Sequence, residues 1–159
     1  MTSAQDVIAA ARAAELSVAV AESLTGGAVC SALVSVPGAS HAFVGGVVSY
    51  SLSAKHTLLG VPDELLETVG PVSRDVAVAM AEGVRTRLGA DVAVSTTGVA
   101  GPEPHDGQPP GTVWVGIATA RGSDARMHVV AGDREAVRDA AVSWALAAAA
   151  QALVEVSHA

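Results

Sequence analysis

The chain has 159 residues, of which 50% are hydrophobic, 16% are charged and 3% are aromatic. This length fits one domain around one hydrophobic core, residues 1–159, and the composition excludes a disordered chain. A formal net charge of −7 and the scarcity of aromatic side chains argue against nucleic-acid binding, because such sites use basic surfaces and stacking platforms.

In the first part of the chain, the apolar periodicity predicts helices that alternate with short buried strands. In chain order, the pattern predicts a helix over residues 3–16, a strand over 17–21, a helix over 28–36, a β-rich segment over 43–50, and helices over 53–59, 62–68 and 73–88. Ser73 and Gly89 are typical residues for the start and the end of the last of these helices.

The rest of the chain predicts three strands and one long helix. In chain order, we expect a strand over 91–96, a glycine-bearing turn over 97–102, a proline-rich loop over 103–110, strands over 111–120 and 126–130 joined by a turn at 121–124, and a helix over 134–156. This alternation predicts an α/β sandwich with a largely parallel or mixed sheet. Ligands of such sheets collect at the C-terminal ends of strands, so the turns at 22–27 and 96–101 are the first candidates for a site.

The turn at residues 22–27 has the composition of an anion-binding or nucleophile-bearing turn. Its glycines, Gly26 and Gly27, let backbone N–H groups approach a ligand, and the N-terminus of the next helix adds a favourable dipole. Ser23 is then either a nucleophile or a phosphate ligand. The alternative is purely structural: Ser23 or Thr25 caps the helix, and the glycines relieve backbone strain.

The segment from Ser49 to Lys55 suggests a serine with a base. Lys55 is the only lysine in the chain, and arginine supplies the other basic residues. A buried lysine has a lowered pKa and accepts a proton from a serine hydroxyl within hydrogen-bond reach. The alternative is an exposed lysine in the first turn of a helix.

Two further segments offer groups for an anionic ligand. Thr97, Gly98 and Gly101 follow a predicted strand and either form an oxyanion or phosphate site or make a plain turn. Arg134, next to a predicted helix cap at Asp133, either binds phosphate or carboxylate in a fork or is simply solvated.

Neither the histidines nor the cysteine has the spacing of a metal site, so we predict none. Cys30 is expected to lie in the middle of a helix and to pack into the hydrophobic core of the protein. Glu22 either orients donors, pairs with Lys55 or caps the helix that follows it.

The N-terminal residues lack the pattern of a signal peptide, and no uninterrupted apolar run has the length of a membrane span. We therefore expect a cytoplasmic protein without a membrane anchor.

Several motifs occur together in a fixed order between about residues 21 and 153, and in these the chain resembles the C-terminal domain of the CinA proteins. That family also includes stand-alone nicotinamide mononucleotide deamidases. The motifs lie at residues 21–27, 46–51, 55, 58–61, 97–102, 111–114 and 132–134, with Val137 and Arg138.

The resemblance implies a three-layer α/β/α sandwich and hydrolysis of nicotinamide mononucleotide to nicotinic acid mononucleotide and ammonia, in a homodimer that needs no metal or cofactor. It implies that Ser23 is the nucleophile and Lys55 its base, with Ser49 or Ser51 as alternative nucleophiles. The other implied site residues are Tyr50 and Ser51 near Lys55, Thr97, Gly98 and Gly101 around the ligand or oxyanion, Arg134 near the phosphate, and Thr25, Gly26 and Gly27 as ligand contacts.

The chain departs from the family pattern in three places. Leu24 stands where a cysteine is usual, Leu52 replaces a common asparagine, and the loop at 103–110 lacks the usual glycine pair. These changes leave the Ser23 and Lys55 positions intact but bear on the substrate. Two other functions remain open: hydrolysis of a different small amide, and a non-catalytic nucleotide-binding or regulatory module linked to competence or DNA damage.

Overall fold

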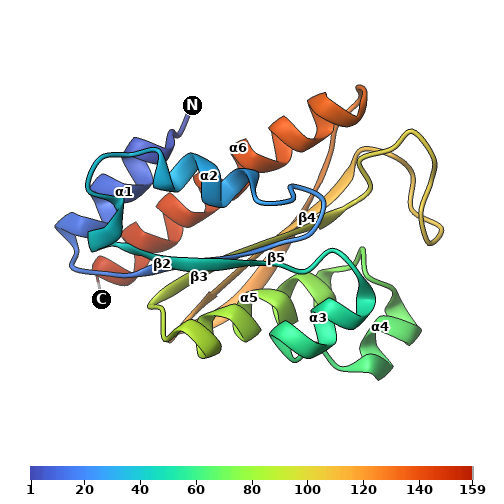
Figure 1. Ribbon diagram of the computed structural model, residues 1–159, viewed down its shortest axis with the longest axis horizontal. Coiled ribbons are helices and arrows are strands. Elements are labelled where there is room, and N and C mark those ends of the chain that lie inside the picture. Colours follow the sequence, from blue (N-terminus) through green and yellow to red (C-terminus); the bar gives the residue numbers. More distant parts are fainter. Residues whose placement is uncertain (159) are drawn as a thin grey trace.

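The computed structural model describes residues 1–158, which form one five-stranded sheet between two layers of helices (Figure 1). The strands are β1 (Val18–Glu22), β2 (Phe43–Val48), β3 (Val92–Gly98), β4 (Thr112–Thr119) and β5 (Gly122–Val129). Their order in the sheet is β2-β1-β3-β4-β5. β1 runs parallel to β2 and β3, whereas β4 pairs antiparallel with β3 and β5. The predicted α/β sandwich with a mixed sheet is confirmed.

The helices divide into one layer on each face of the sheet (Figure 1). One layer holds α1 (Ala4–Ala13), α2 (Ala28–Val34) and α6 (Arg134–Ser157), and the other holds α3 (Leu52–Leu59), α4 (Asp63–Val69) and α5 (Arg74–Leu88). A short 3-10 turn, Ala39–His41, precedes β2. The chain is therefore a three-layer α/β/α sandwich.

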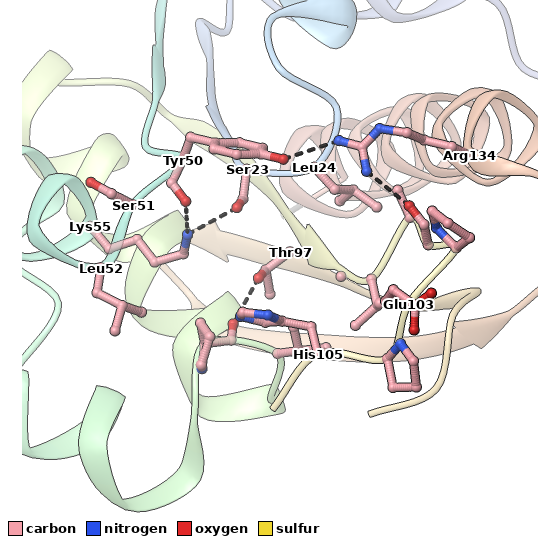
Figure 2. A pocket seen from close by; sticks show the side chains of 18 residues that line it. Ser23, Leu24, Tyr50, Ser51, Leu52, Lys55, Thr97, Glu103, His105 and Arg134 are labelled. Atoms are coloured by element: carbon pink, nitrogen blue, oxygen red, sulfur yellow. Dashed lines mark hydrogen bonds between the residues drawn. The ribbon is translucent and has the colours of Figure 1, made fainter. Parts of the chain in front are cut away.

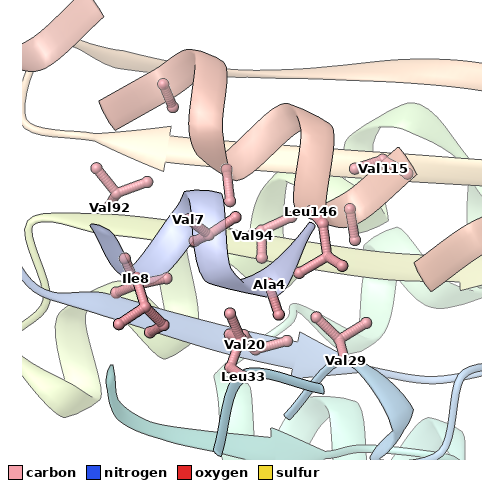
Figure 3. Close-up of a cluster of buried hydrophobic side chains, with 14 of the residues drawn as sticks. Ala4, Val7, Ile8, Val20, Val29, Leu33, Val92, Val94, Val115 and Leu146 are labelled. Atoms are coloured by element: carbon pink, nitrogen blue, oxygen red, sulfur yellow. The ribbon is translucent and has the colours of Figure 1, made fainter. Parts of the chain in front are cut away.

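Alternate residues of the central strands β1 and β3 supply the two halves of the core, as the period of two in a strand requires. The residues packed with α1, α2 and α6 are Val18, Val20, Val92 and Val94. Figure 3 shows the last three of them among the side chains of this cluster. Those packed with α3, α4 and α5 are Ala19, Ala21 and Ala93. The two strands are buried on both faces, which explains why their sequences are apolar throughout.

The sequence placed most elements correctly but was wrong about the start of the last strand. The turn predicted at 121–124 is shorter, because Thr119 already pairs with Gly122 across the hairpin. Ser123 and Asp124 belong to β5, a polar segment at the edge of the sheet where such side chains remain in contact with water. The first helix ends at Ala13 instead of continuing to residue 16, and Glu15 adopts a left-handed φ of 56°.

Among residues 1–158, α6 is the one helix whose length and composition would also suit a membrane span. Its buried residues recur every three or four positions, the spacing of one helix face. They are Val137, Ala141, Ala145, Leu146, Ala149, Ala152 and Leu153. This face packs against the sheet, so α6 is a core helix of the sandwich.

Candidate active site

The candidate site is a cavity of about 450 Å³ at the edge of the sheet where the parallel strands β1 and β3 end. Its walls come from five parts of the chain: the turn after β1, the start of α3, the link before α5, the loop between β3 and β4, and the start of α6. Figure 2 shows Ser23 and Lys55 on one side of this cavity and Arg134 and Glu103 on the other. The site therefore lies where the rule for open α/β sheets places it.

Ser23 and Lys55 meet at the inner end of the cavity. Ser23 directly follows β1, and Lys55 lies in α3 with its side chain turned inward. Lys55 Nζ lies 2.9 Å from Ser23 Oγ, 2.8 Å from the Ser49 carbonyl oxygen and 3.5 Å from the Tyr50 carbonyl oxygen. Lys55 is only 2% exposed, which excludes the alternative of a solvated surface lysine.

Burial also lowers the pKa of Lys55 from its ordinary 10.5 to about 8, because the ammonium form loses its water. A neutral amine has two N–H groups and one lone pair. The carbonyl oxygens of Ser49 and Tyr50 can accept the two N–H groups, and the lone pair then accepts the hydroxyl proton of Ser23. The surroundings of Lys55 thus suit a base that takes a proton from Ser23.

Of the three serines considered as nucleophiles, only Ser23 brings its hydroxyl to Lys55 within residues 1–158. The Ser49 hydroxyl is buried and donates to the Glu22 carbonyl oxygen at 3.4 Å. The Ser51 hydroxyl accepts from the backbone N–H of Ala54 at 3.1 Å and so caps α3. Geometry therefore favours Ser23 over Ser49 and Ser51.

Glu22 caps α2 and does not pair with Lys55. Its fully buried carboxylate accepts the backbone N–H groups of Gly27 at 3.0 Å, Val29 at 3.1 Å and Cys30 at 2.9 Å. The N-terminus of α2, where the sequence suggested a ligand anion, is thus occupied by a carboxylate of the chain itself.

The structure does not bring the predicted ligand contacts Thr25, Gly26 and Gly27 to the wall of this cavity. None of the three lines the cavity. Gly26 N–H donates to the Ser23 carbonyl oxygen, Gly27 N–H donates to Glu22, and the Thr25 hydroxyl is bonded to that of Thr96 at 2.7 Å. Their polar groups are used to hold the turn that carries Ser23.

The other predicted site residues do line the cavity, in two groups. Tyr50 and Ser51 lie beside Lys55 as expected, and Thr97, Gly98 and Gly101 form the wall from the end of β3 and the loop after it. The Thr97 hydroxyl donates to the Pro71 carbonyl oxygen at 2.7 Å, so its proton is used to hold the link before α5.

Arg134 lies at the mouth and joins two walls of the cavity. Its guanidinium donates to the Gly101 carbonyl oxygen and to the Tyr50 hydroxyl, each at 3.0 Å (Figure 2). Both partners are neutral, and none of the ion pairs among residues 1–158 includes Arg134. Its positive charge is therefore available to an anionic ligand.

Sequence reasoning did not identify several residues of the wall. Pro71 and Val72 reach the cavity from the link before α5, and Glu103, Pro104 and His105 reach it from the loop between β3 and β4. The polarity of that loop was visible in the sequence, but Pro71 and Val72 carried no local signal. Within residues 1–158, no group of three or more His, Cys, Asp or Glu side chains is arranged to hold a metal ion.

Comparison with known proteins identifies a family. Residues 1–153 match the family model described as the CinA C-terminal domain. A CinA-like protein of Frankia casuarinae is 50% identical over 128 residues, which is 80% of this chain and 30% of that protein. One of Salinibacter ruber is 46% identical over 145 residues, 91% of this chain and 35% of that protein. The chain thus spans about a third of the length of these curated relatives.

Solved structures match over nearly the whole chain. The structure of a CinA superfamily protein from Klebsiella pneumoniae has a TM-score of 0.92 and 35% identity, and the match covers 96% of both chains. A CinA superfamily protein from Escherichia coli has a TM-score of 0.89 and 34% identity, and covers 95% of this chain and 87% of that one. Both proteins share the sandwich described above.

Proposed function

The chain belongs to the family of CinA C-terminal domains, and from this premise and the geometry of the cavity we propose that it is an amidohydrolase. Its proposed substrate is nicotinamide mononucleotide, which it converts to nicotinic acid mononucleotide and ammonia. The observation that carries the proposal is the 2.9 Å approach of Ser23 Oγ to the buried amine of Lys55. That pair has the geometry of a nucleophile and its general base.

The reaction begins with acyl transfer to Ser23. Neutral Lys55 takes the hydroxyl proton as Ser23 Oγ attacks the carboxamide carbon, which gives a tetrahedral intermediate. The Lys55 ammonium then returns that proton to the departing nitrogen, and ammonia leaves. In the second half, Lys55 accepts a proton from water as the water attacks the acyl ester. The Lys55 ammonium then returns that proton to Ser23 Oγ as the ester bond breaks, which releases nicotinic acid mononucleotide and restores the hydroxyl and the neutral amine.

The cavity offers complementary groups for the rest of such a substrate. Its volume of about 450 Å³ falls within the roughly 300–1,000 Å³ of small-molecule sites. Leu24, Leu52 and Pro71 give apolar surface for a pyridine ring near Ser23. Arg134 lies at the opposite side with an uncompensated positive charge, where it suits a phosphate group.

Ammonia release from nicotinamide mononucleotide by the purified chain tests the proposal directly. We expect turnover in the wild type and none above background in Ser23→Ala, which removes the nucleophile but keeps the fold. A folded wild type that binds the nucleotide in calorimetry and releases no ammonia would contradict the amidase and favour a nucleotide-binding module. Turnover of other small carboxamides but not of the nucleotide would mean that the chain is an amidase with a different substrate.

The pH dependence of kcat/KM should follow the protonation of Lys55. Only the neutral amine accepts the serine proton, and its pKa is lowered to about 8 by burial. Activity should therefore fall about tenfold per pH unit below that pKa and level off above it. The measurement is ammonia release over a pH series, with circular dichroism at each pH to verify folding. A profile that is flat or that falls toward high pH would exclude Lys55 as the base.

A further inference from the structure

The turn that carries Ser23 is held from outside by an arginine that the proposed mechanism does not use. Arg138 lies in α6, one helical turn after Arg134. Its Nε donates to the Leu24 carbonyl oxygen and its Nη2 donates to the Thr25 carbonyl oxygen, each at 3.0 Å. The guanidinium thus binds the carbonyl oxygens of the two residues that immediately follow the nucleophile.

Two backbone N–H groups of the turn, those of Leu24 and Thr25, donate to no other group among residues 1–158, and that of Leu24 belongs to the peptide group next to Ser23. The Ser23 carbonyl oxygen accepts from Gly26 N–H at 3.1 Å. Since a peptide group is planar and trans, the N–H of Leu24 points in the opposite direction. None of residues 1–158 accepts a hydrogen bond from it, and Leu24 lines the cavity. The N–H of the residue after a nucleophile is a recurrent oxyanion donor in acyl transfer.

A second donor comes from the end of β3. Val99 directs both its N–H and its carbonyl oxygen toward β4, through Thr112 and Gly111. Because successive strand residues alternate in direction, Gly98 directs its N–H toward the β1 side of the sheet. There β1 has ended at Glu22, and Ser23 follows it. A side chain at Gly98 would lie 2.6 Å from the Thr112 carbonyl oxygen, so only glycine allows this close approach.

We propose that Arg138 is a positioning residue of this site, an inference that rests on the acyl-transfer function proposed above. By holding the carbonyl groups of Leu24 and Thr25, it fixes the turn so that the Leu24 N–H, together with the Gly98 N–H, receives the developing oxyanion. Arg138 itself does not touch the substrate. Its effect on the reaction is transmitted through the two peptide groups that it binds, to the preceding peptide group, which carries the Leu24 N–H.

The matched pair Arg138→Met and Arg134→Met tests the inference, because the same substitution is made one turn apart on one helix. Loss of an oxyanion donor lowers kcat by about 10²–10³-fold, so a misplaced donor should cost about tenfold or more. We expect Arg138→Met to lower kcat for nicotinamide mononucleotide by at least that factor with little change in KM. Arg134→Met should mainly raise KM. Arg138→Lys, which keeps the charge and one donor, should lie between Arg138→Met and wild type.

A substrate-independent measurement separates this inference from the proposed function. A fluorophosphonate labels an activated serine as Ser23 Oγ forms a bond to phosphorus and fluoride leaves, and its P=O oxygen occupies the oxyanion position. Labelling followed by intact mass should slow about tenfold or more in Arg138→Met relative to the wild type. Circular dichroism and melting curves establish that each variant is folded, and Arg138→Lys replaces Arg138→Met if the latter unfolds.

The two assays together distinguish an error in the role of Arg138 from an error in the proposed substrate or reaction. Folded Arg138→Met that reacts at the wild-type rate in both assays overturns the positioning role. A wild type that is labelled at Ser23 but leaves nicotinamide mononucleotide intact overturns the proposed substrate, and the labelling rates still decide the role of Arg138. A folded wild type that neither reacts with the label nor turns over the nucleotide overturns both.

Discussion

Lys55→Met is expected to reduce ammonia release from nicotinamide mononucleotide by about 10³-fold or more, because it removes the base that activates Ser23. Methionine keeps the length of an unbranched side chain and fills the same buried volume at 2% exposure. The loss should appear in kcat and kcat/KM alike, since Lys55 lies beside Ser23 and far from Arg134. Steady-state kinetics measures both.

The same variant should keep or gain stability, which distinguishes loss of a base from loss of the fold. The lowered pKa of Lys55, about 8 against 10.5, means that burial of the ammonium form costs about 3 kcal/mol of folding free energy at 1.36 kcal/mol per pH unit. This cost applies in full below pH 8 and disappears as the pH rises toward 10.5, because the unfolded chain then also carries a neutral amine.

Methionine carries no charge, so the Lys55→Met protein does not have this unfavourable contribution. It also leaves the Ser49 carbonyl oxygen without its 2.8 Å donor, which lowers the free energy of unfolding by about 1–3 kcal/mol and offsets the gain. We expect the net free energy of unfolding at pH 7 to be unchanged or higher, measured by urea titration. A Lys55→Met protein that is folded and still turns over at the wild-type rate would rule out the serine–lysine mechanism.

Glu22→Gln is expected to produce the largest loss of stability of any single conservative change in the site region. The Glu22 carboxylate accepts three backbone N–H groups at the start of α2 and is fully buried. An amide of the same shape has one acceptor oxygen, which can keep the N–H groups of Gly27 and Val29 but binds them without a charge, and its NH₂ group then faces the N–H of Cys30, which loses its acceptor. Hydrogen bonds to charged groups contribute about 1.5–3 kcal/mol each, so the variant should lose about 3 kcal/mol or more.

Thermal unfolding measures this loss, and a shift of about 2–4 °C per kcal/mol in a chain of this size predicts a Tm lower by roughly 10 °C. Asp6→Asn is the matched control. Asp6 also accepts a backbone N–H at a helix start, in the capping box with Ser3, but it is exposed to water. It should change Tm much less than Glu22→Gln does. Equal shifts in the two variants would mean that burial does not account for the role of Glu22.

The fold was largely predictable because its elements follow local rules. Buried strands such as β1 and β3 are continuous apolar runs, and caps at Ser73 and Asp133 mark helix starts that the structure retains. The start of β5 was missed for a physical reason. Gly122, Ser123 and Asp124 have turn composition, and only their pairing with β4 makes them part of a strand.

The site was predictable where one strand end or one unusual residue carried the signal. The position of Ser23 after β1 and the uniqueness of Lys55 pointed to the pair that the structure brings together. Long-range contacts carried no such signal. Arg138 reaches the Leu24 carbonyl across 114 positions of sequence, and Pro71 reaches the Thr97 hydroxyl across 26. The role of Glu22 was undecided for the same reason: a carboxylate at a strand end is equally able to face a ligand, a lysine or the next helix.

Because Lys55 is the only lysine in the chain, its burial also determines how this protein reacts with lysine-directed reagents. Because the chain has a single lysine and that residue lines the cavity, every lysine-directed dye, acetyl donor or cross-linker meets its side-chain target only inside the site. Bulky reagents that cannot enter will leave the folded side chain untouched, whereas small ones will modify the one amine on which the proposed reaction depends. Surface attachment of this protein therefore has to be made through other functional groups.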